Sequence, residues 1–393
     1  LSNGFFWAMG RSQDVTLFHD WFTSRGQGTG AEYRYVRDQG SGGNLRTYYL
    51  NEHQSTFSQN GSDRNFPARR SYNIRGDVRQ QLTPSITARG NINFFSDITV
   101  EQTYQNNIFE ASNRERSMSG NIAGSWGSYQ LSGTYDANET FFGDKTSTLW
   151  GGGPRLNFGQ GQKAIPGTPL YYSFNTEYVR LLRRTTFSAK NRDSIDAGLN
   201  RIDMSPTLQF PFTRWPFLTV NSSISFRSTY WTESVNPDTN RQIPVGIMRN
   251  FADLQSQITG PSFVKVWDTP DSTYSERMKH VIEPYVTLRR LSSIDQFDEI
   301  VRLESVDSIV GGVTQFTYGL NNRVYARLAG SGSAREVLNV GLTQTYYTND
   351  QAAQYDQRFS TSFNETSPSN FSPLALMVRG DPSDRLSGTL RTE

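Results

Sequence analysis

Three histidines are the residues of this chain whose type could most readily support catalysis or bind a metal ion. His19 is followed by Asp20, and a histidine oriented by an aspartate is the core of many general-base sites. The simpler alternative is that His19, Asp20 and Trp21 form the end of a strand. His53 lies in a polar segment, and none of the three, His280 included, has a partner at metal-ligand spacing. We therefore expect no catalytic residue and no metal site.

A run of three glycines, from Gly151 to Gly153, is the stretch that comes nearest to a phosphate-binding loop. Such loops continue into a lysine and a helix, and here neither follows. Glycines inside a strand mark a bulge or a kink instead, so we expect a bulge or a flexible kink at this point and no cofactor. The chain has no cysteine, which leaves it without a disulfide or a thiolate metal site.

The basic residues are almost all arginine, with 34 arginines against 5 lysines. The guanidinium group is a planar fork that binds phosphate and carboxylate through two parallel hydrogen bonds. A GC-rich genome would give the same bias without any function. The formal net charge is only +2, which argues against a nucleic-acid-binding protein because such proteins carry a basic stripe.

The elements that carry these residues alternate between apolar and polar positions. In residues 81–95 (QLTPSITARGNINFF) every second residue from Ile86 to Phe94 is apolar or small, whereas the residues between them include Thr87, Arg89 and Asn91. This period of two is typical of a β-strand with one apolar face, and helical periodicity is nearly absent. Roughly 17 such segments, most of about 9–13 residues, follow one another without a linker. The sequence therefore predicts a single all-β domain over residues 1–393.

The composition indicates an ordered protein with few aliphatic side chains. Hydrophobic residues make up 35 % of the chain, and aromatic residues make up 13 %. Disordered chains are poor in aromatic residues. No run of about 18 apolar residues occurs, so the sequence predicts no membrane-spanning helix. The chain starts without Met and ends inside an alternating run, and we expect it to be a fragment.

The connections between the segments alternate in length. Short turns are expected near residues 10–13, 38–43, 82–84, 127–128, 211–216 and 329–335, and longer polar loops near residues 52–69, 96–113, 185–198, 232–249 and 292–311. The breaks near residues 159–169 and 260–279 are longer than this rule predicts. Transmembrane barrels have short periplasmic turns and long outer loops, whereas a soluble sandwich has no reason to separate them. The sequence therefore predicts an antiparallel transmembrane β-barrel, with a soluble β-sandwich or solenoid as the alternative.

Charges on the polar faces also favour a barrel with a wet lumen, because a packed soluble core would exclude them. We expect the apolar faces to contact lipid, with the tryptophans Trp21, Trp126, Trp215 and Trp231 at the membrane interfaces. The predicted lipid-facing residues include Ile86, Ile92, Leu131, Tyr135, Val220, Ile224, Leu320 and Val324. The lumen-facing polar candidates are Glu32, Arg34, Arg75, Asp77, Arg79, Arg89, Asp136, Arg227, Arg323 and Arg327.

Four segments, taken in order, carry a resemblance to one family of outer-membrane proteins. The segments contain Phe5-Phe6-Trp7 with Asp14, Arg25-Gly26 and Glu32-Tyr33-Arg34-Tyr35; His280 to Pro284; Gly319, Leu320 and Arg323; and REVLNVGLTQTYY, residues 335–347. This ordered set resembles the LptD family of lipopolysaccharide-assembly proteins, also called organic solvent tolerance proteins. The resemblance covers essentially the whole chain.

The resemblance implies a barrel of about 26 strands that opens sideways between its first and last strands, preceded by a periplasmic jelly-roll domain. By this resemblance the chain lacks the jelly roll and the first strand and stops about eight strands before closure, so we expect an incomplete barrel of roughly 17 strands. Gly4, Phe5, Phe6 and Trp7 would lie near the lateral gate. Prolines weaken the gate strands in the family; Gly4 weakens a strand but keeps its N–H.

For function, the resemblance implies a translocon in the bacterial outer membrane that inserts lipopolysaccharide into the outer leaflet, and not an enzyme. Its partners would be lipopolysaccharide, outer-membrane lipids, an LptE-like lipoprotein plug and periplasmic Lpt bridge proteins. The polar lumen would pass sugars and phosphates while the acyl chains leave into the membrane, and the loops near residues 52–69, 96–113 and 232–249 would lie over or in the lumen. The alternatives are a porin or uptake receptor, and a barrel enzyme that acts on lipid A or phospholipid.

Overall fold

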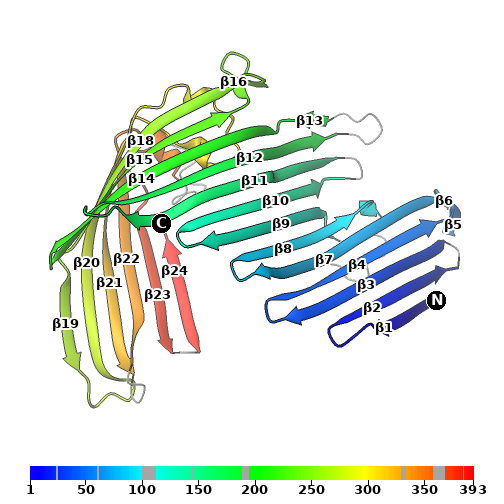
Figure 1. Ribbon diagram of the computed structural model, residues 1–393, viewed down its shortest axis with the longest axis horizontal. Coiled ribbons are helices and arrows are strands. Elements are labelled where there is room, and N and C mark those ends of the chain that lie inside the picture. The colour runs from blue at the N-terminus through cyan, green and yellow to red at the C-terminus, as the bar shows by residue number, and fades with distance from the viewer. Residues whose placement is uncertain are drawn as a thin grey trace. The chain divides into compact units, whose positions relative to one another are not determined.

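The computed structural model describes residues 1–23, 25–59, 62–99, 112–143, 146–187, 194–328, 333–356, 368–383 and 385–393, without the side chains of residues 57–59, 62–64 and 66. These residues are almost entirely strand (Figure 1). Twenty strands are hydrogen-bonded into one sheet, and every pairing whose register is resolved is antiparallel. The predicted all-β antiparallel architecture is therefore confirmed, with more strands than the roughly 17 expected from periodicity. No helix among the described residues is long and apolar enough to span a membrane.

The strands of the first part of the chain are β1 (Ser2–Ala8), β2 (Gln13–Phe22), β3 (Gly26–Asp38), β4 (Ser41–Glu52), β5 (Ser55–Gln59), β6 (Ser62–Phe66), β7 (Arg69–Thr83), β8 (Ile86–Phe95), β9 (Glu115–Trp126), β10 (Tyr129–Phe141), β11 (Ser147–Ala164), β12 (Tyr171–Thr186) and β13 (Ser194–Asp196). Then follow β14 (Leu199–Trp215), β15 (Leu218–Trp231), β16 (Ser234–Asn236), β17 (Arg241–Ile243), β18 (Ile247–Thr259), β19 (Phe263–Asp268), β20 (Ser275–Leu291), β21 (Thr314–Leu328), β22 (Ala334–Tyr347), β23 (Ala375–Ser383) and β24 (Leu386–Thr392). Three short helical turns, η1 (Phe297–Glu299), η2 (Ser305–Ser308) and α3 (Gln351–Gln354), lie in the loops.

The described residues divide into two compact units, each of which is considered by itself. Unit 1 is Leu1–Gln160 with Thr176–Ile202, and unit 2 is Gly161–Asn175 with Asp203–Glu393. Strands β11, β12 and β14 contribute residues to both units. The expectation of one domain over the whole chain stays a prediction.

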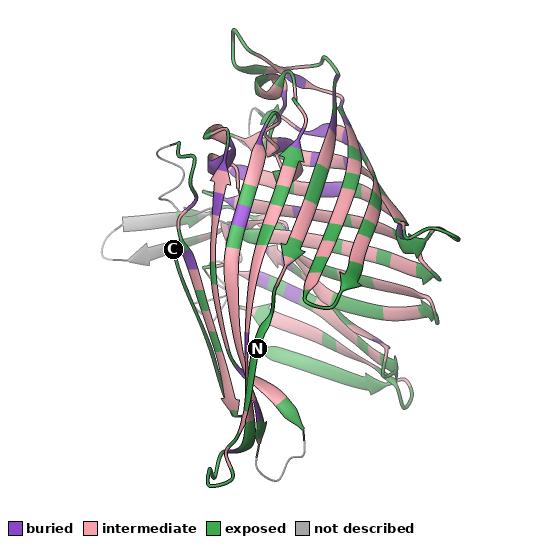
Figure 2. Cartoon of the chain, turned by 90° about the vertical axis from the view of Figure 1, so that its left-hand side faces the viewer, coloured by how far each residue is buried: buried purple, intermediate pink, exposed green. Residues whose placement is uncertain are grey.

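Within each unit the alternation of the sequence becomes two distinct faces of the sheet. In unit 1 the register pairs Ile92 with both Gly76 and Met118, whereas the next pair along, Asn91 and Asp77, lies on the opposite face. We call the side that carries Ile92 in unit 1, and Ile224 in unit 2, the apolar face, and the other side the polar face. Figure 2 shows the alternation as exposed and intermediate bands along the strands.

The two long breaks expected near residues 159–169 and 260–279 are occupied largely by strand. Strand β11 continues to Ala164, and a tight turn leads to β12. Strands β18 and β19 both pair with β20, on successive stretches of it, and are separated only by residues 260–262. Both apparent exceptions to the rule of short turns disappear, because the alternation is less regular there although the strands continue.

Of the two alternatives expected at the glycine run, a bulge or a kink, the structure has the bulge. The pairing of β10 with β11 shifts register between Thr134 and Asp136. The Asp136 carboxylate accepts a hydrogen bond from the Gly152 amide at 3.1 Å. A Cβ on Gly153 would lie 2.2 Å from the ring of Tyr135, so only glycine lets this ring pack flat against the bulged strand.

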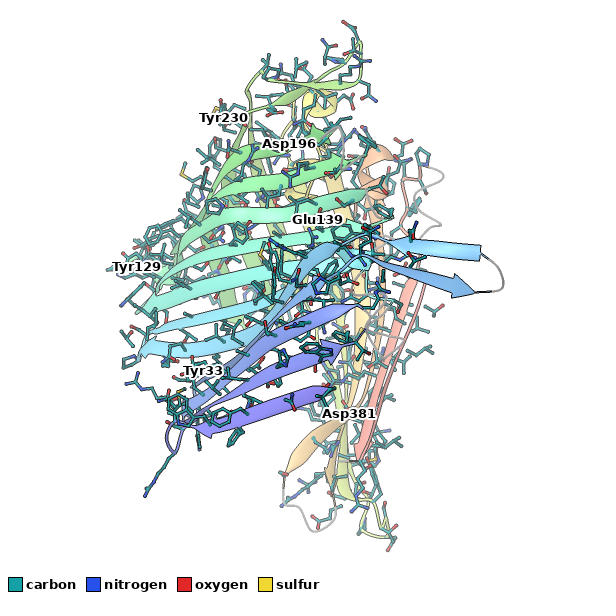
Figure 3. All side chains as sticks on the ribbon, turned by 90° about the vertical axis from the view of Figure 1, so that its right-hand side faces the viewer. Tyr33, Tyr129, Glu139, Asp196, Tyr230 and Asp381 are labelled. Carbon is teal, nitrogen blue, oxygen red and sulfur yellow. The ribbon has the colours of Figure 1, made fainter. Side chains whose placement is uncertain are left out.

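Three of the four tryptophans assigned to membrane interfaces are exposed at strand ends. Trp21, Trp126 and Trp215 are about half exposed, and Trp215 stacks on Phe217 across a short turn at 6.1 Å. Tyr33 and Tyr129, labelled in Figure 3, lie on the apolar face near other short turns. The assignment of Trp231 is wrong. Its side chain is fully buried on the polar face, because a loop covers it.

Candidate functional site

The polar face of unit 1 carries rows of polar side chains that cross six neighbouring strands. One row joins Glu32, Arg46, Arg75, Asn93, Ser117 and Asn138 through direct register pairs, and the next joins Arg34, Asn44, Asp77, Asn91, Ser119 and Asp136. Arg79 and Arg89 form a third level. All seven lumen candidates of unit 1 therefore share one face and are dispersed over β3, β7, β8 and β10. That this face lines a lumen stays a prediction.

Arginines stand directly opposite one another on this face. Arg79 is the register partner of Arg89, and Arg46 is the partner of Arg75. Like charges placed opposite each other destabilise a sheet. Among the described residues, no carboxylate lies within 4.0 Å of the guanidinium groups of Arg46, Arg79 or Arg89, and Arg79 and Arg89 are exposed. This part of the face therefore presents positive charge to whatever lies above it.

Other arginines of unit 1 are paired with acids. Arg34 contacts Asp14 at 2.9 Å. Near the loop ends of the strands, the buried Glu52 bridges Arg25 at 2.8 Å and Arg69 at 2.9 Å. A buried carboxylate with two guanidinium partners is compensated, so this cluster fixes the ends of β3, β4 and β7 and adds little to the open positive charge.

The polar face of unit 2 also carries arginines, and here the acids neutralise them. Arg227 donates two hydrogen bonds to Asp203, through Nε at 2.9 Å and Nη2 at 2.8 Å. Arg289 binds Asp253 in the same bidentate way, with a shortest contact of 2.6 Å. The two further lumen candidates follow this pattern: Arg323 pairs with Glu283, and Arg327 lies 3.7 Å from Glu276. Bidentate pairs of this kind hold neighbouring strands in a fixed register.

The loop formed by residues 292–313 folds onto the polar face of unit 2. Its anchor is Asp307, which is fully buried. The Asp307 carboxylate accepts hydrogen bonds from the Trp231 indole N–H at 3.0 Å and from the backbone amides of Leu303 and Glu304 at 3.1 and 2.8 Å. Arg249 donates to the carbonyl of residue 306 at 2.9 Å. The loop is thus attached to the polar-face ends of β15 and β18.

Apolar packing completes the attachment of this loop. A cluster of buried residues on the polar face contains Phe251, Leu291, Val313, Tyr347, Ala352 and Ala353, and Ile294, Ile309 and Val310 of the loop pack against it. The loop after β22 joins the same assembly, since the Arg302 guanidinium lies 5.0 Å from the ring centre of Phe297 and donates to the Tyr355 hydroxyl at 3.0 Å. The end of the polar face that the loop 292–313 covers is therefore a small apolar core and is not exposed to water.

Most of this chain matches the model of one protein family. The model of the family described as LptD, LPS transport system D, matches residues 68–393. The chain belongs to the LptD family. It is a protein of the bacterial outer membrane, and the family resemblance noted from the sequence is confirmed.

Among curated relatives, the LPS-assembly protein LptD of Shewanella frigidimarina (strain NCIMB 400) is 22 % identical over 392 aligned residues, which cover 93 % of this chain and 46 % of the relative. The chain thus spans about half the length of the curated relative that it matches. Solved structures with detectable similarity include OprD of Pseudomonas aeruginosa, with 6 % identity, 100 % and 92 % coverage of the two chains and a TM-score of 0.31, and OccAB3 of Acinetobacter baumannii, with 9 % identity, 100 % and 98 % coverage and a TM-score of 0.30.

The gate candidates of this LptD-family chain lie on β1, which pairs with β2 and places Gly4 opposite Phe18. Phe5, Phe6 and Trp7 are each more than half exposed. A lateral gate at these residues stays a prediction. The loops expected over the lumen are described only in part: residues 60–61 and 100–111 lie outside the described ranges, and residues 234–243 form the small hairpin of β16 and β17.

The histidines take no part in a recognisable site. His19 and Asp20 are neighbours in β2, so their side chains project to opposite faces of the sheet and cannot form a dyad. In the part of the chain that the structure describes, no three histidine, aspartate or glutamate side chains gather closely enough to hold a metal ion.

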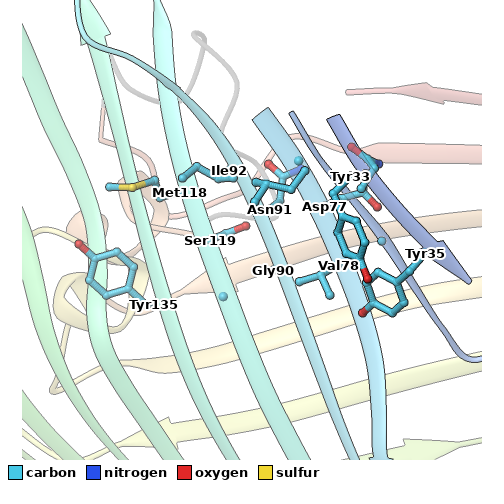
Figure 4. A pocket seen from close by; sticks show the side chains of 15 residues that line it. Tyr33, Tyr35, Asp77, Val78, Gly90, Asn91, Ile92, Met118, Ser119 and Tyr135 are labelled. Carbon is cyan, nitrogen blue, oxygen red and sulfur yellow. The ribbon is translucent and has the colours of Figure 1, made fainter. Parts of the chain in front are cut away.

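The apolar face of unit 1 contains a shallow groove of about 550 Å³ (Figure 4). Its floor is made of glycines on four strands, Gly43, Gly76, Gly90 and Gly120, and its sides include Tyr33, Tyr35, Val78, Ile92, Met118 and Tyr135. Unit 2 has a groove of similar size on its own apolar face.

Proposed function

We propose that the polar faces of this LptD-family chain form the lumen wall of a translocon that passes the sugars and phosphates of lipopolysaccharide, while the apolar faces contact membrane lipid. The observation that carries the proposal is the opposed pair Arg79 and Arg89, which has no carboxylate partner among the described residues. Two facing guanidinium groups favour an anion between or above them. The phosphate groups of lipopolysaccharide are anions of this kind.

The dispersion of these arginines fits a cargo that must move. Each charge-assisted hydrogen bond contributes about 1.5–3 kcal/mol, so several bonds at one point would hold the cargo in place. On unit 1 the arginines of β4, β7 and β8 occupy two levels, Arg46 with Arg75 and Arg79 with Arg89, and the level between them carries Asn44, Asp77 and Asn91. Weak contacts repeated along a wall would let a multiply phosphorylated glycolipid advance, because each phosphate could pass from one arginine to the next.

The arginines of unit 2 have another role in this proposal. Because Asp203 and Asp253 already neutralise Arg227 and Arg289, these pairs stabilise the wall and offer little free charge. The loop 292–313 covers the polar face at the ends of β15 and β18, and in this proposal it narrows the lumen there. A translocon needs both properties, a wall that keeps its shape and a lumen that is covered on the outside.

The proposal describes a transport protein and not an enzyme. Lipopolysaccharide and outer-membrane lipids are its proposed ligands. An LptE-like lipoprotein in the lumen and the periplasmic Lpt bridge proteins are its proposed protein partners, because the family is one of LPS transport. A porin or uptake receptor would also have a polar lumen, and the experiment below separates it from a conduit for lipopolysaccharide.

The test is site-specific photo-crosslinking in cells that express the complete protein. A photoreactive amino acid at Arg79 or Arg89 is expected to capture lipopolysaccharide. The matched control is the next register pair, Gln80 and Ala88, which belongs to the same two strands and projects to the opposite face. Capture at the control pair alone, or at none of the four positions, would contradict the proposal.

A charge series gives a second readout. Arg79→Glu is expected to lower the amount of lipopolysaccharide at the cell surface, whereas Arg79→Lys keeps the positive charge and should retain most of it. If Arg79→Glu instead changes the uptake of small solutes and leaves surface lipopolysaccharide unchanged, the porin alternative is favoured.

A further inference from the structure

The groove on the apolar face of unit 2 ends at an arginine, and we propose that it binds one phosphorylated lipid of the outer leaflet, with the acyl chains along the groove and the phosphate at Arg290. The groove has a volume of about 560 Å³, within the range of about 300–1,000 Å³ that is usual for small-molecule sites. This inference rests on the proposed contact of the apolar face with lipid. It concerns a site on the outer wall, not the lumen.

Strand register places Arg290 on the apolar face. Arg290 is the partner of Leu254, and Leu254 is the partner of Ile224. The next row joins Leu288, Ser256 and Ser222 on the same side. The guanidinium group therefore shares its face with exposed leucine and isoleucine side chains, while its neighbour Arg289 lies on the opposite face with Asp253.

The shape of the groove suits acyl chains. Leu208, Phe210, Ile224, Leu254 and Leu288 provide apolar walls. The floor is low where Ser222 and Ser256 face each other, and their hydroxyl groups share one hydrogen bond of 3.0 Å. Because these hydroxyls are already hydrogen-bonded to each other, the floor accepts a hydrocarbon chain at little cost.

Among the described residues that line this groove, Arg290 alone carries a charge. Its Nη1 donates to the Thr314 hydroxyl at 2.9 Å and lies 3.5 Å from the Gly312 carbonyl. Within the described ranges it has no carboxylate partner. Its Nε and Nη2 donors are thus available for a bidentate contact, which is the geometry in which arginine binds phosphate.

The position of Arg290 along its strand determines the depth in the membrane at which the lipid headgroup would bind. It is the last residue on the apolar face of β20 before the loop 292–313 leaves toward the polar face. An arginine on a lipid-facing surface costs about 2–4 kcal/mol at the membrane midplane and about 0–1 kcal/mol near an interface. The end of the strand is where an unpaired arginine is tolerated, and an anionic headgroup removes the remaining cost.

Charge complementarity decides the occupant. A zwitterionic lipid would bring its own ammonium group close to Arg290, whereas the phosphate of lipid A brings only negative charge and several acyl chains. The groove of unit 1 is a useful contrast, because no arginine or lysine lines it. We therefore expect it to hold lipid without selection for the headgroup.

The complete protein is reconstituted in nanodiscs of phosphatidylethanolamine with a minor fraction of lipid A and is then released into mild detergent. Native mass spectrometry measures how much lipid A stays bound to it. Arg290→Ala is expected to lower the occupancy of lipid A about tenfold, the loss of one charge-assisted contact, and Arg290→Lys to lower it less. Ser256→Phe fills the groove floor and should lower it as strongly. The matched control is Arg70→Ala, because Arg70 is an exposed arginine on the apolar face of β7 that lines neither groove.

Equal occupancy in the wild type and in Arg290→Ala would overturn the inference, as would an equal loss in Arg70→Ala. A loss in Ser256→Phe without a loss in Arg290→Ala would also overturn it, because the groove would then bind chains without a phosphate contact. Replacing lipid A by phosphatidylglycerol tests whether any phosphorylated lipid suffices; equal retention would overturn the choice of lipid A. Surface delivery of lipopolysaccharide, measured in parallel, distinguishes a failure of this inference from a failure of the proposed conduit.

Discussion

Removal of the Asp307 carboxylate is expected to detach the loop 292–313 from the polar face without unfolding the sheet. In Asp307→Ala the Trp231 indole N–H and the amides of Leu303 and Glu304 lose their acceptor. Each donor left without a partner costs about 1–3 kcal/mol, so the three lost hydrogen bonds weaken the attachment of the loop by roughly 3–9 kcal/mol before water enters. Trp231→Phe removes only one donor and should cost about 1 kcal/mol.

Hydrogen exchange read by mass spectrometry on the detergent-solubilised protein measures this effect. Even a loss of about 3 kcal/mol in local opening free energy accelerates exchange of the loop amides about 100-fold. Asp298→Ala is the control, since Asp298 is an exposed acid of the same loop and its carboxylate forms no hydrogen bond or ion pair with the other described residues. The reasoning is refuted if peptides that contain Leu303 and Glu304 exchange at the wild-type rate in Asp307→Ala, or if Asp298→Ala accelerates them equally.

Three further predictions concern the faces and the sides of the sheet. Ile92→Arg should destabilise the folded barrel by about 2–4 kcal/mol while Asn91→Arg, on the opposite face, costs far less; unfolding titrations in detergent would show equal losses if the faces were assigned wrongly. Gly28→Ala places a Cβ 1.8 Å from the Tyr48 hydroxyl oxygen and should cost about 1–3 kcal/mol, a penalty that shrinks in a Tyr48→Ala background; an additive double mutant would exclude this contact as the cause. A cysteine at Asn240 should react with an impermeant reagent on intact cells, whereas cysteines in the short turns should react only after the outer membrane is permeabilised; the reverse pattern would invert the topology.

The faces of the sheet were predictable from the sequence because a strand alternates sides at every residue. The pattern around Ile92 gave the correct side for each of its neighbours without any knowledge of strand pairing. The bulge at Gly152 was predictable for a similar reason, since three adjacent glycines cannot pack a regular strand. These features depend on residues close together in the chain.

The loop on the polar face was not predictable in this way. The contact that anchors it joins Trp231 and Asp307, 76 positions apart, and a strand-end tryptophan is usually interfacial. One signal was present: Ile300, Val301 and Ile309 are apolar residues inside a segment that was taken for a polar outer loop. A water-exposed loop seldom contains several large apolar side chains, so these residues indicated that the loop is buried against another surface.

The partner of each arginine, and not its presence, decides what that arginine can bind. Arg227 cannot capture a phosphate without giving up its bidentate contact with the buried Asp203, and breaking a buried ion pair costs several kcal/mol. No such exchange is needed at Arg79, which faces another arginine, or at Arg290, which holds only a hydroxyl and a carbonyl. Sequence cannot separate these cases because the acid comes from a neighbouring strand whose register it does not specify. The arginines of this chain are therefore of two kinds. Those paired with an acid, such as Arg227 and Arg289, hold neighbouring strands in register, and those without one, such as Arg79 and Arg290, are the positions at which we propose that an anionic glycolipid binds.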